Sequence, residues 1–302
     1  MGKLARFFVV TALIAAGTTC AASTRWQSWR AAPARVDPAQ LPRDITILRD
    51  VRYGEGTSET FDVYAPRDAN AAPVIFMVHG GGWRRGDKTA RRVVQNKVVH
   101  WLPRGFILVS VDYPMLPDTP PLQQARAVAL ALAVAQRDAT RWGGDPKRFV
   151  LMGHSAGAHL VSLISAEPAL AISQGALPWL GTVALDSAAF NVAAIMQARH
   201  PGLYDRAFGN EPAPWAALSP LVQLRAKIAP FLAVCSSLRR DSCPQADAFA
   251  AKARAFGARV QTLPEAMRHG AINEDLGLPS AYTSAVDGFL ASLDPALADR
   301  LR

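Results

Sequence analysis

Ser155 stands between two glycines in the segment G-H-S-A-G (residues 153–157), where its hydroxyl is placed to act as a nucleophile. Mostly apolar residues lead into this segment, and an alanine-rich, helix-like run follows it. This pattern is typical of a strand that ends in a sharp turn and opens a helix. The turn needs glycine where side chains would collide, and it holds the hydroxyl at the helix N-terminus, where developing negative charge is favoured.

The hydroxyl of Ser155 needs a base that removes its proton and a third group that orients the base. Side chains that follow parallel strands meet at one edge of a sheet, where ligands bind. His269 follows the last expected strand and is the best candidate for the base. Asp241, in the loop after the strand expected at 231–234, is the favoured acid, and the order serine, acid, histidine fits this architecture. Asp186, which follows the preceding strand, remains the alternative.

Three consecutive glycines in H-G-G-G-W (residues 79–83) follow the buried strand expected at 74–78. A glycine backbone can approach a reacting carbonyl closely, and N–H groups fixed in advance stabilise the oxyanion of a tetrahedral intermediate. We expect the N–H of Gly81 or Gly82, together with that of Ala156, to form this oxyanion hole.

The first 22 residues have the pattern of a secretory signal peptide. Lys3 and Arg6 precede an apolar run at 7–16, and small residues follow that run. The run is too short for a transmembrane helix, so export to the periplasm or the medium is expected. Cys20 leaves open a lipoprotein whose mature chain begins at that cysteine and is held at the membrane. An uncleaved N-terminal anchor is a further alternative.

Cys235 and Cys243, eight residues apart, are the cysteines that remain beyond the signal segment. An even pair in an exported protein favours a disulfide, here one that closes a single loop. Such a bridge would brace the loop that carries Asp241. Two free thiols remain the alternative, because a bridge across so short a loop must meet strict geometry.

The composition, 302 residues of which 50% are hydrophobic, allows one large α/β domain, although the length alone would also allow two. The formal net charge is +9, but the basic residues are scattered and no nucleic-acid-binding module is recognisable, so no nucleic-acid partner is expected. No cluster of cysteine, histidine, aspartate or glutamate has metal-ligand spacing, so we expect neither a metal nor another cofactor.

Five basic residues follow the glycine triplet closely. A solvated helix face is the favoured interpretation, and the alternative is a basic rim that attracts an acidic substrate to the mouth of the site. The five are Arg84, Arg85, Lys88, Arg91 and Arg92.

Apolar runs and alternations predict the elements that must position these residues. Two strands at 45–53 and 60–64 form an antiparallel hairpin. Strands and helices then alternate to the end of the chain, which predicts a mainly parallel central sheet with helices on both faces. The later strands are expected at 74–78, 106–111, 148–152, 182–185, 231–234 and 259–263, and the helices at 89–102, 120–142, 245–256 and 280–293.

These elements place the domain at residues 44–302, after the signal segment at 1–22 and a linker or N-terminal arm at 23–43. The interval 191–227 interrupts the alternation and contains four prolines. It is long for a connection, so we expect a lid-like insertion that roofs a pocket. An ordinary surface excursion is the alternative.

Together these motifs resemble those of the α/β-hydrolase superfamily, in its H-G-G-G esterase and lipase branch. The nearest likeness is to the carboxylesterase and feruloyl-esterase-like group, which also resembles arylformamidases. The resemblance covers roughly residues 44–293. It is carried by H-G-G-G-W-x-x-G-D-K at 79–88, G-H-S-A-G-A-H-L at 153–160 and H-G-A-I-N-E-D-L-G at 269–277.

The resemblance implies an α/β-hydrolase fold with Ser155 as nucleophile, Asp241 as acid and His269 as base. The expected activity is hydrolysis of small to medium carboxylic esters through an acyl-enzyme. The same groups could cleave an aryl formamide, and a hydrolase-like protein that binds without turnover is the alternative outside enzymes.

Overall fold

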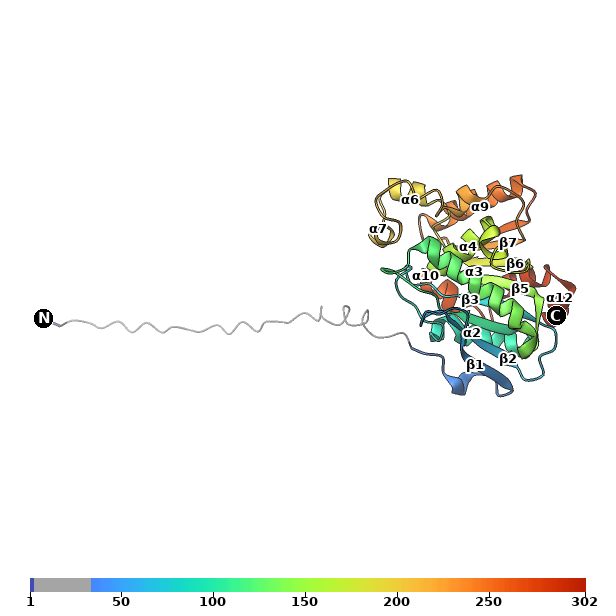
Figure 1. Ribbon diagram of the computed structural model, residues 1–302. Coiled ribbons are helices and arrows are strands. Elements are labelled where there is room, and N and C mark those ends of the chain that lie inside the picture. Colours follow the sequence, from blue (N-terminus) through green and yellow to red (C-terminus); the bar gives the residue numbers. More distant parts are fainter. Residues whose placement is uncertain (3–33) are drawn as a thin grey trace. The chain divides into compact units, whose positions relative to one another are not determined.

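An eight-stranded sheet is the centre of the fold, in a computed structural model that describes residues 1–2 and 34–302 (Figure 1). The strand order is β1-β2-β4-β3-β5-β6-β7-β8. β2 pairs antiparallel with both β1 and β4, and all later neighbours are parallel. The strands are Ile45–Arg52 (β1), Thr60–Pro66 (β2), Ala72–Val78 (β3), Ile107–Val111 (β4), Gly144–His154 (β5), Gly181–Leu185 (β6), Phe231–Ser236 (β7) and Val260–Glu265 (β8).

Helices cover both faces of this sheet. The α-helices are Arg91–Trp101 (α2), Pro121–Asp138 (α3), Ala156–Ala166 (α4), Ala169–Ile172 (α5), Val192–Gln197 (α6), Leu203–Phe208 (α7), Pro220–Gln223 (α8), Ser242–Ala255 (α9), His269–Glu274 (α10), Ala281–Ala291 (α11) and Pro295–Arg300 (α12). Short 3-10 helices lie at Pro38–Gln40 (η1), Leu102–Arg104 (η2) and Ala139–Trp142 (η3).

The alternation of side chains along β3 explains the two faces. Phe76 joins a core cluster with residues of α3 and α4, whereas Ile75 and Met77 join a second cluster with residues of α2, α11 and α12. A third cluster lies between α4, α9 and the strands β6 and β7. Because both faces are covered, β3 is buried along its whole length, which accounts for its continuous apolar sequence.

The expected sheet, hairpin and alternation of strands and helices are confirmed. The predicted elements differ from the observed ones mainly at their ends: α9 begins at Ser242 rather than 245, and β5 extends from Gly144 to His154 rather than over 148–152. The short helices α5, α6, α7, α8, α10 and α12 were not predicted. The helix expected at 120–142 is α3 followed by η3. Such ends depend on capping and on tertiary contacts more than on apolar periodicity.

Residues 34–302 form one compact unit, so the described part of the expected arm lies on the domain. Val36 N–H donates to Thr89 O at 2.8 Å, and Arg91 N–H donates to Ala34 O at 2.7 Å. Leu41 is buried in the core shared with α2. The apolar segment at 7–16 and Cys20 lie outside the described residues. In the part of the chain that is described, no helix is long and apolar enough to cross a membrane.

The interval 191–227 contains the three short helices α6, α7 and α8. Aromatic side chains fix it to the loop after β3. Trp83 lies against Tyr204 and Phe208 of α7, with ring centroids 6.0 and 4.8 Å away. His159 of α4 adds a contact from its Nε2 to Leu218 O at 2.8 Å. The interval is therefore packed on the elements that carry the glycine motifs.

Candidate active site

Ser155 lies at the sharp turn between β5 and α4, as its motif predicts. Its backbone has φ of 55° and ψ of −116°, a conformation that L residues seldom adopt, and its N–H donates to Leu185 O of β6 at 3.0 Å. The neighbouring glycines are required sterically: a Cβ at Gly157 would lie 2.2 Å from Val78 O, and one at Gly153 would lie 2.4 Å from Gly157 O. The turn therefore packs directly against the end of β3.

His269 begins α10, just after β8, and joins Ser155 to a carboxylate. Its Nδ1 lies 2.5 Å from Oδ2 of Asp186, and its Nε2 lies 2.9 Å from Oγ of Ser155. An ionised carboxylate only accepts hydrogen bonds, so Nδ1 carries the proton and donates it to Asp186. Nε2 is then free to accept from the serine hydroxyl, the arrangement that a general base requires.

The favoured assignment of Asp241 as the acid is wrong, and the alternative, Asp186, occupies that place. Asp241 is the residue directly before α9, its side chain is 46% exposed, and its carboxylate lies 3.6 Å from Arg239. No hydrogen bond or ion pair joins it to His269 within residues 34–302. The loop after β7 still reaches the histidine, but through Arg239, whose Nη1 lies 3.1 Å from His269 Nδ1, while Asp241 lies just before α9 and contacts Arg239 instead.

Asp186 is fully buried and accepts four hydrogen bonds. Oδ2 accepts from His269 and from Nη1 of Arg239 at 2.9 Å, while Oδ1 accepts from Ser236 N–H at 2.8 Å and from the Ser242 hydroxyl. Burial alone would oppose ionisation, but these donors and the arginine charge outweigh it and hold the pKa of Asp186 well below its usual value. The acid is therefore ionised at any pH at which His269 could act as a base.

Of the three residues expected to form the oxyanion hole, Gly81 and Gly82 lie on the loop after β3, and Ala156 directly follows Ser155. Gly81 and Gly82 have φ of 136° and 63°, and Ala156 is the first residue of α4. A Cβ at Gly81 would lie 1.6 Å from Arg85 O, so no other residue fits there. Among the hydrogen bonds found within residues 34–302, none is donated by the N–H of Gly81, Gly82 or Ala156.

A partly buried ionic cluster lies beside the glycine loop. His79 Nε2 lies 3.1 Å from Oδ1 of Asp112, and the same oxygen accepts from Lys88 N–H at 2.7 Å. Lys88 Nζ lies 2.6 Å from Asp50 and 3.4 Å from the buried Asp62. Lys88 is therefore neither on a solvated helix face nor on a basic rim, because its side chain is buried against these carboxylates. Sequence analysis missed Asp112, although its place directly after β4 is a signal of the same kind as that of Asp186.

Two further histidines near Ser155 are structural, and both are neutral at neutral pH. Burial lowers the pKa of His154 to about 3 and that of His159 to about 4. His154 Nε2 lies 2.9 Å from His269 O, and His159 accepts from Trp83 Nε1 at 3.2 Å. They hold the loops around the site in place and carry no charge into it.

Cys235 and Cys243 form the expected disulfide, with their Cα atoms 5.1 Å apart. The bridge joins the end of β7 to the first turn of α9. It closes the loop that presents Ser236, Arg239 and Ser242 to Asp186. The bridge was expected to brace the loop that carries Asp241. That same loop surrounds Asp186, so the bridge braces the donors that hold Asp186 in place.

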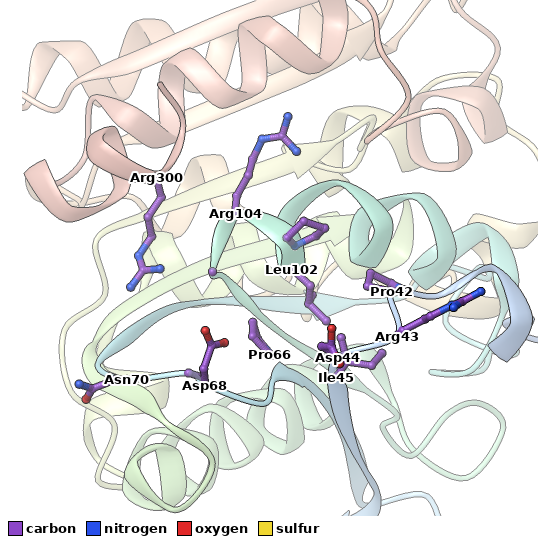
Figure 2. A pocket seen from close by; sticks show the side chains of 13 residues that line it. Pro42, Arg43, Asp44, Ile45, Pro66, Asp68, Asn70, Leu102, Arg104 and Arg300 are labelled. Atoms are coloured by element: carbon purple, nitrogen blue, oxygen red, sulfur yellow. The ribbon is translucent and has the colours of Figure 1, made fainter.

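Two hollows lie away from Ser155. One, of about 620 Å³, lies where β3 and β4 begin, at the opposite end of the strands from the triad; Figure 2 shows its lining side chains, among them Asp68 and Arg300. The other, of about 540 Å³, lies over the ionic cluster of Lys88. Neither is lined by Ser155, His269 or Asp186, so we place the chemistry at the triad rather than in these hollows.

Comparison with known proteins finds hydrolases that are similar to part of this chain. The BD-FAE family model matches residues 61–197. A probable carboxylic ester hydrolase of Mycobacterium tuberculosis is 31% identical over 153 residues, 46% of this chain and 35% of that protein. A probable isoprenylcysteine alpha-carbonyl methylesterase of Oryza sativa subsp. japonica is 31% identical over 130 residues, 43% and 31% of the two chains. Kynurenine formamidase of Salmo salar is 34% identical over 122 residues, 39% and 38%. The matched region thus spans about a third of the length of these relatives.

Solved structures of esterases share the fold over most of the chain. Esterase B from Lactobacillus rhamnosis superposes with a TM-score of 0.69 at 20% identity, covering 86% of this chain and 88% of that one. A truncated carbohydrate esterase from gut microbiota gives a TM-score of 0.71 at 14% identity, with 89% and 99% covered. At these identities the likeness to the solved structures establishes the fold alone. Part of the chain is therefore similar to carboxylesterase-like hydrolases, and the chain shares its fold with solved esterases.

Proposed function

We propose that this protein is a serine hydrolase that cleaves carboxylic esters through an acyl-enzyme. The observation that carries the proposal is the continuous contact from Ser155 through His269 to Asp186, with distances of 2.9 and 2.5 Å. The esterase relatives support an ester as the substrate class. A hydrolase-like protein that only binds would have no need to keep an ionised acid buried against the base.

In the first half of the proposed reaction, His269 takes the hydroxyl proton of Ser155 as Oγ attacks the ester carbonyl carbon. The carbonyl oxygen becomes an oxyanion that accepts from the N–H groups of Gly81 or Gly82 and Ala156. The imidazolium then donates its proton to the alcohol oxygen as the carbon–oxygen bond breaks. Water, deprotonated by His269, attacks the acyl-serine in the second half and regenerates the hydroxyl. Asp186 stays ionised throughout and stabilises the imidazolium.

The nucleophile is tested by Ser155→Ala, with Ser284→Ala on the exposed surface of α11 as the matched control. We expect Ser155→Ala to lose p-nitrophenyl acetate hydrolysis by at least about 10³-fold, since residual catalysis comes from binding and the oxyanion hole alone. A phosphonate ester should add its mass to the peptide containing Ser155 in the wild type and in Ser284→Ala. Equal hydrolysis rates for the wild type and Ser155→Ala would refute the proposal.

An aryl formamide is the second candidate substrate, and the likeness to kynurenine formamidase of Salmo salar favours its inclusion. The chemistry would be the same, with a formyl-serine in place of the longer acyl group. A panel of short-chain, long-chain and feruloyl esters together with N-formylkynurenine would separate the two. If kcat/KM for N-formylkynurenine exceeded that for every ester, the substrate class would change and the triad would not.

We also infer that the protein is exported. The disulfide supports this, because such bridges persist in oxidising compartments, and the pattern of residues 1–22 supports it independently. The mass of the mature protein recovered from outside the cytoplasm should correspond to a chain that begins just after the signal segment. A mass that begins at Cys20 and includes lipid would indicate the lipoprotein, and an uncleaved cytoplasmic chain would contradict export.

A further inference from the structure

Arg239 places a positive charge beside the catalytic base. Its Nη1 lies 2.9 Å from Asp186 Oδ2, the oxygen that also accepts from His269, and 3.1 Å from His269 Nδ1. Both nitrogens carry protons, so they are two donors that converge on one carboxylate oxygen. The guanidinium therefore contacts the imidazole on the side opposite Ser155, where no step of the proposed reaction takes place.

We propose that Arg239 is a positioning residue that extends the activity of His269 as a base to lower pH, an inference that rests on the proposed esterase function. When His269 takes a proton in the free enzyme, it becomes a second cation against the guanidinium, and both must share Asp186. Two like charges at this separation disfavour the protonated imidazole. Arg239 thus keeps His269 unprotonated at a pH where a histidine facing the aspartate alone would already be charged.

The position of Arg239 is fixed from several sides. Its guanidinium also donates to Asp186 O at 3.3 Å, lies 3.6 Å from Asp241, and interacts with Tyr204 of α7. The disulfide between Cys235 and Cys243 closes the loop on which it lies. Asp241, although not the acid, therefore holds the residue that contacts the acid. Tyr204 links the interval 191–227 to the same guanidinium.

Among the titratable groups found around His269 in residues 34–302, Arg239 is the cation that contacts it. His154 packs against its ring at 4.6 Å but is neutral, since burial holds the pKa of His154 near 3. Lys97 of α2 hydrogen-bonds Asn273 in the helix that His269 begins. The remaining groups are Arg268, exposed and adjacent in the chain, Glu265 at the end of β8, Tyr282 of α11, and Asp241 and Tyr204, which reach the site through Arg239.

The test compares Arg239→Gln, Arg239→Lys and Arg240→Gln. Arg240 is the next residue, is exposed, and is in none of the ion pairs found within residues 34–302, so its variant removes the same charge without the contact. We measure kcat/KM of p-nitrophenyl acetate hydrolysis against pH. In Arg239→Gln the acid limb of the profile should move to higher pH by about one unit. Arg239→Lys should keep the limb near its wild-type position, and Arg240→Gln should not move it.

A spectroscopic readout makes the test independent of turnover. The downfield proton resonance of the His269 imidazole, titrated by NMR, should show the same shift in Arg239→Gln. Arg239→Met, which keeps the aliphatic stem, replaces the glutamine variant if that variant does not fold. A rate that falls equally at every pH, with the limb unmoved, would reduce Arg239 to a packing residue and overturn the inference. An inactive wild type, or equal rates in Ser155→Ala, would instead refute the proposed function.

Discussion

At the scale of residues, the candidate site depends on one carboxylate whose four lone-pair directions are all used. Asp186 follows β6 with φ of 54°, an unusual value for a residue other than glycine, and this turn aims its side chain beneath His269. Ser155 is held in a comparably strained conformation at the end of β5. Strain of this kind persists only where surrounding contacts enforce it, and it is common at functional sites. The two strained residues are joined by a single imidazole.

Replacing the two candidate acids separates them by function. Asp186→Asn should lower kcat for p-nitrophenyl acetate by about 10³- to 10⁴-fold, because an amide can donate to Nδ1 and favours the tautomer that cannot accept the serine proton. Asp241→Asn should stay within about tenfold of the wild type, since it only loosens Arg239. A loss of similar size at Asp241, with Asp186→Asn nearly unaffected, would return the role of acid to the loop after β7.

At the scale of elements, the strand-turn-helix of β5 and α4 is held by close backbone packing. Gly157, in the first turn of α4, lies against two carbonyl oxygens at the end of β3: a Cβ there would be 2.2 Å from Val78 O and 2.5 Å from His79 O. These atoms belong to backbone that cannot rotate away. The same contact joins the turn that carries Ser155 to the start of the glycine loop. The stability of the domain and the geometry of the proposed oxyanion hole therefore both depend on the close packing of Gly157 against the end of β3.

Gly157→Ala should therefore lower the free energy of unfolding by about 2 kcal/mol or more, through overpacking against fixed backbone. Gly288→Ala is the matched control, because Gly288 is also inside a helix, α11, and a Cβ added there would meet no atom within 4 Å. That variant should gain up to about 1 kcal/mol from helix propensity. Urea denaturation of both measures the difference, and a neutral Gly157→Ala would show that β3 and α4 can move apart.

At the scale of the whole molecule, a buried lysine ties two helices on one face of the sheet. Lys97 of α2 is 1% exposed, and its Nζ donates to Asn273 O at 2.6 Å and to Asn273 Oδ1 at 3.0 Å. Asn273 belongs to α10, the helix that begins with His269. Burial lowers the pKa of Lys97 to about 7. The position of His269, the proposed base, thus depends in part on an amine that changes its charge near neutral pH.

This burial predicts how stability depends on pH. Between about pH 7 and the ordinary lysine value of 10.5, the unfolded chain binds a proton at Lys97 that the folded chain has lost. The free energy of unfolding therefore rises with pH in this window, by at most about 1.4 kcal/mol per unit from this group. Lys97→Met should lose that rise, while Lys147→Met, at an exposed lysine, should keep it. Identical slopes for wild type and Lys97→Met in urea denaturation would contradict the assignment.

Local patterns were enough to predict Ser155, the glycine loop, His269, the strands of the sheet and the longer helices, but not the short helices α5, α6, α7, α8, α10 and α12. Gly153 and Gly157 are required by close backbone contacts at the turn from strand to helix. Buried strands require apolar residues because both of their faces are covered. Both requirements can be recognised in the sequence. The pairing of Cys235 with Cys243 was predictable because they are the two cysteines beyond the signal segment, and an even pair in an exported protein favours a disulfide.

Only the tertiary structure decided which acid reaches His269, where Arg239 lies and that Lys88 is buried. Asp186 and Asp241 both follow strands, and each precedes the histidine in the chain. The choice between them depends on what each contacts in the fold: Ser236, Arg239 and Ser242 donate to Asp186, whereas Asp241 lies just before α9 and contacts Arg239. Those are relations between segments far apart in sequence, and a hydrogen bond between residues 83 positions apart leaves no local pattern to read.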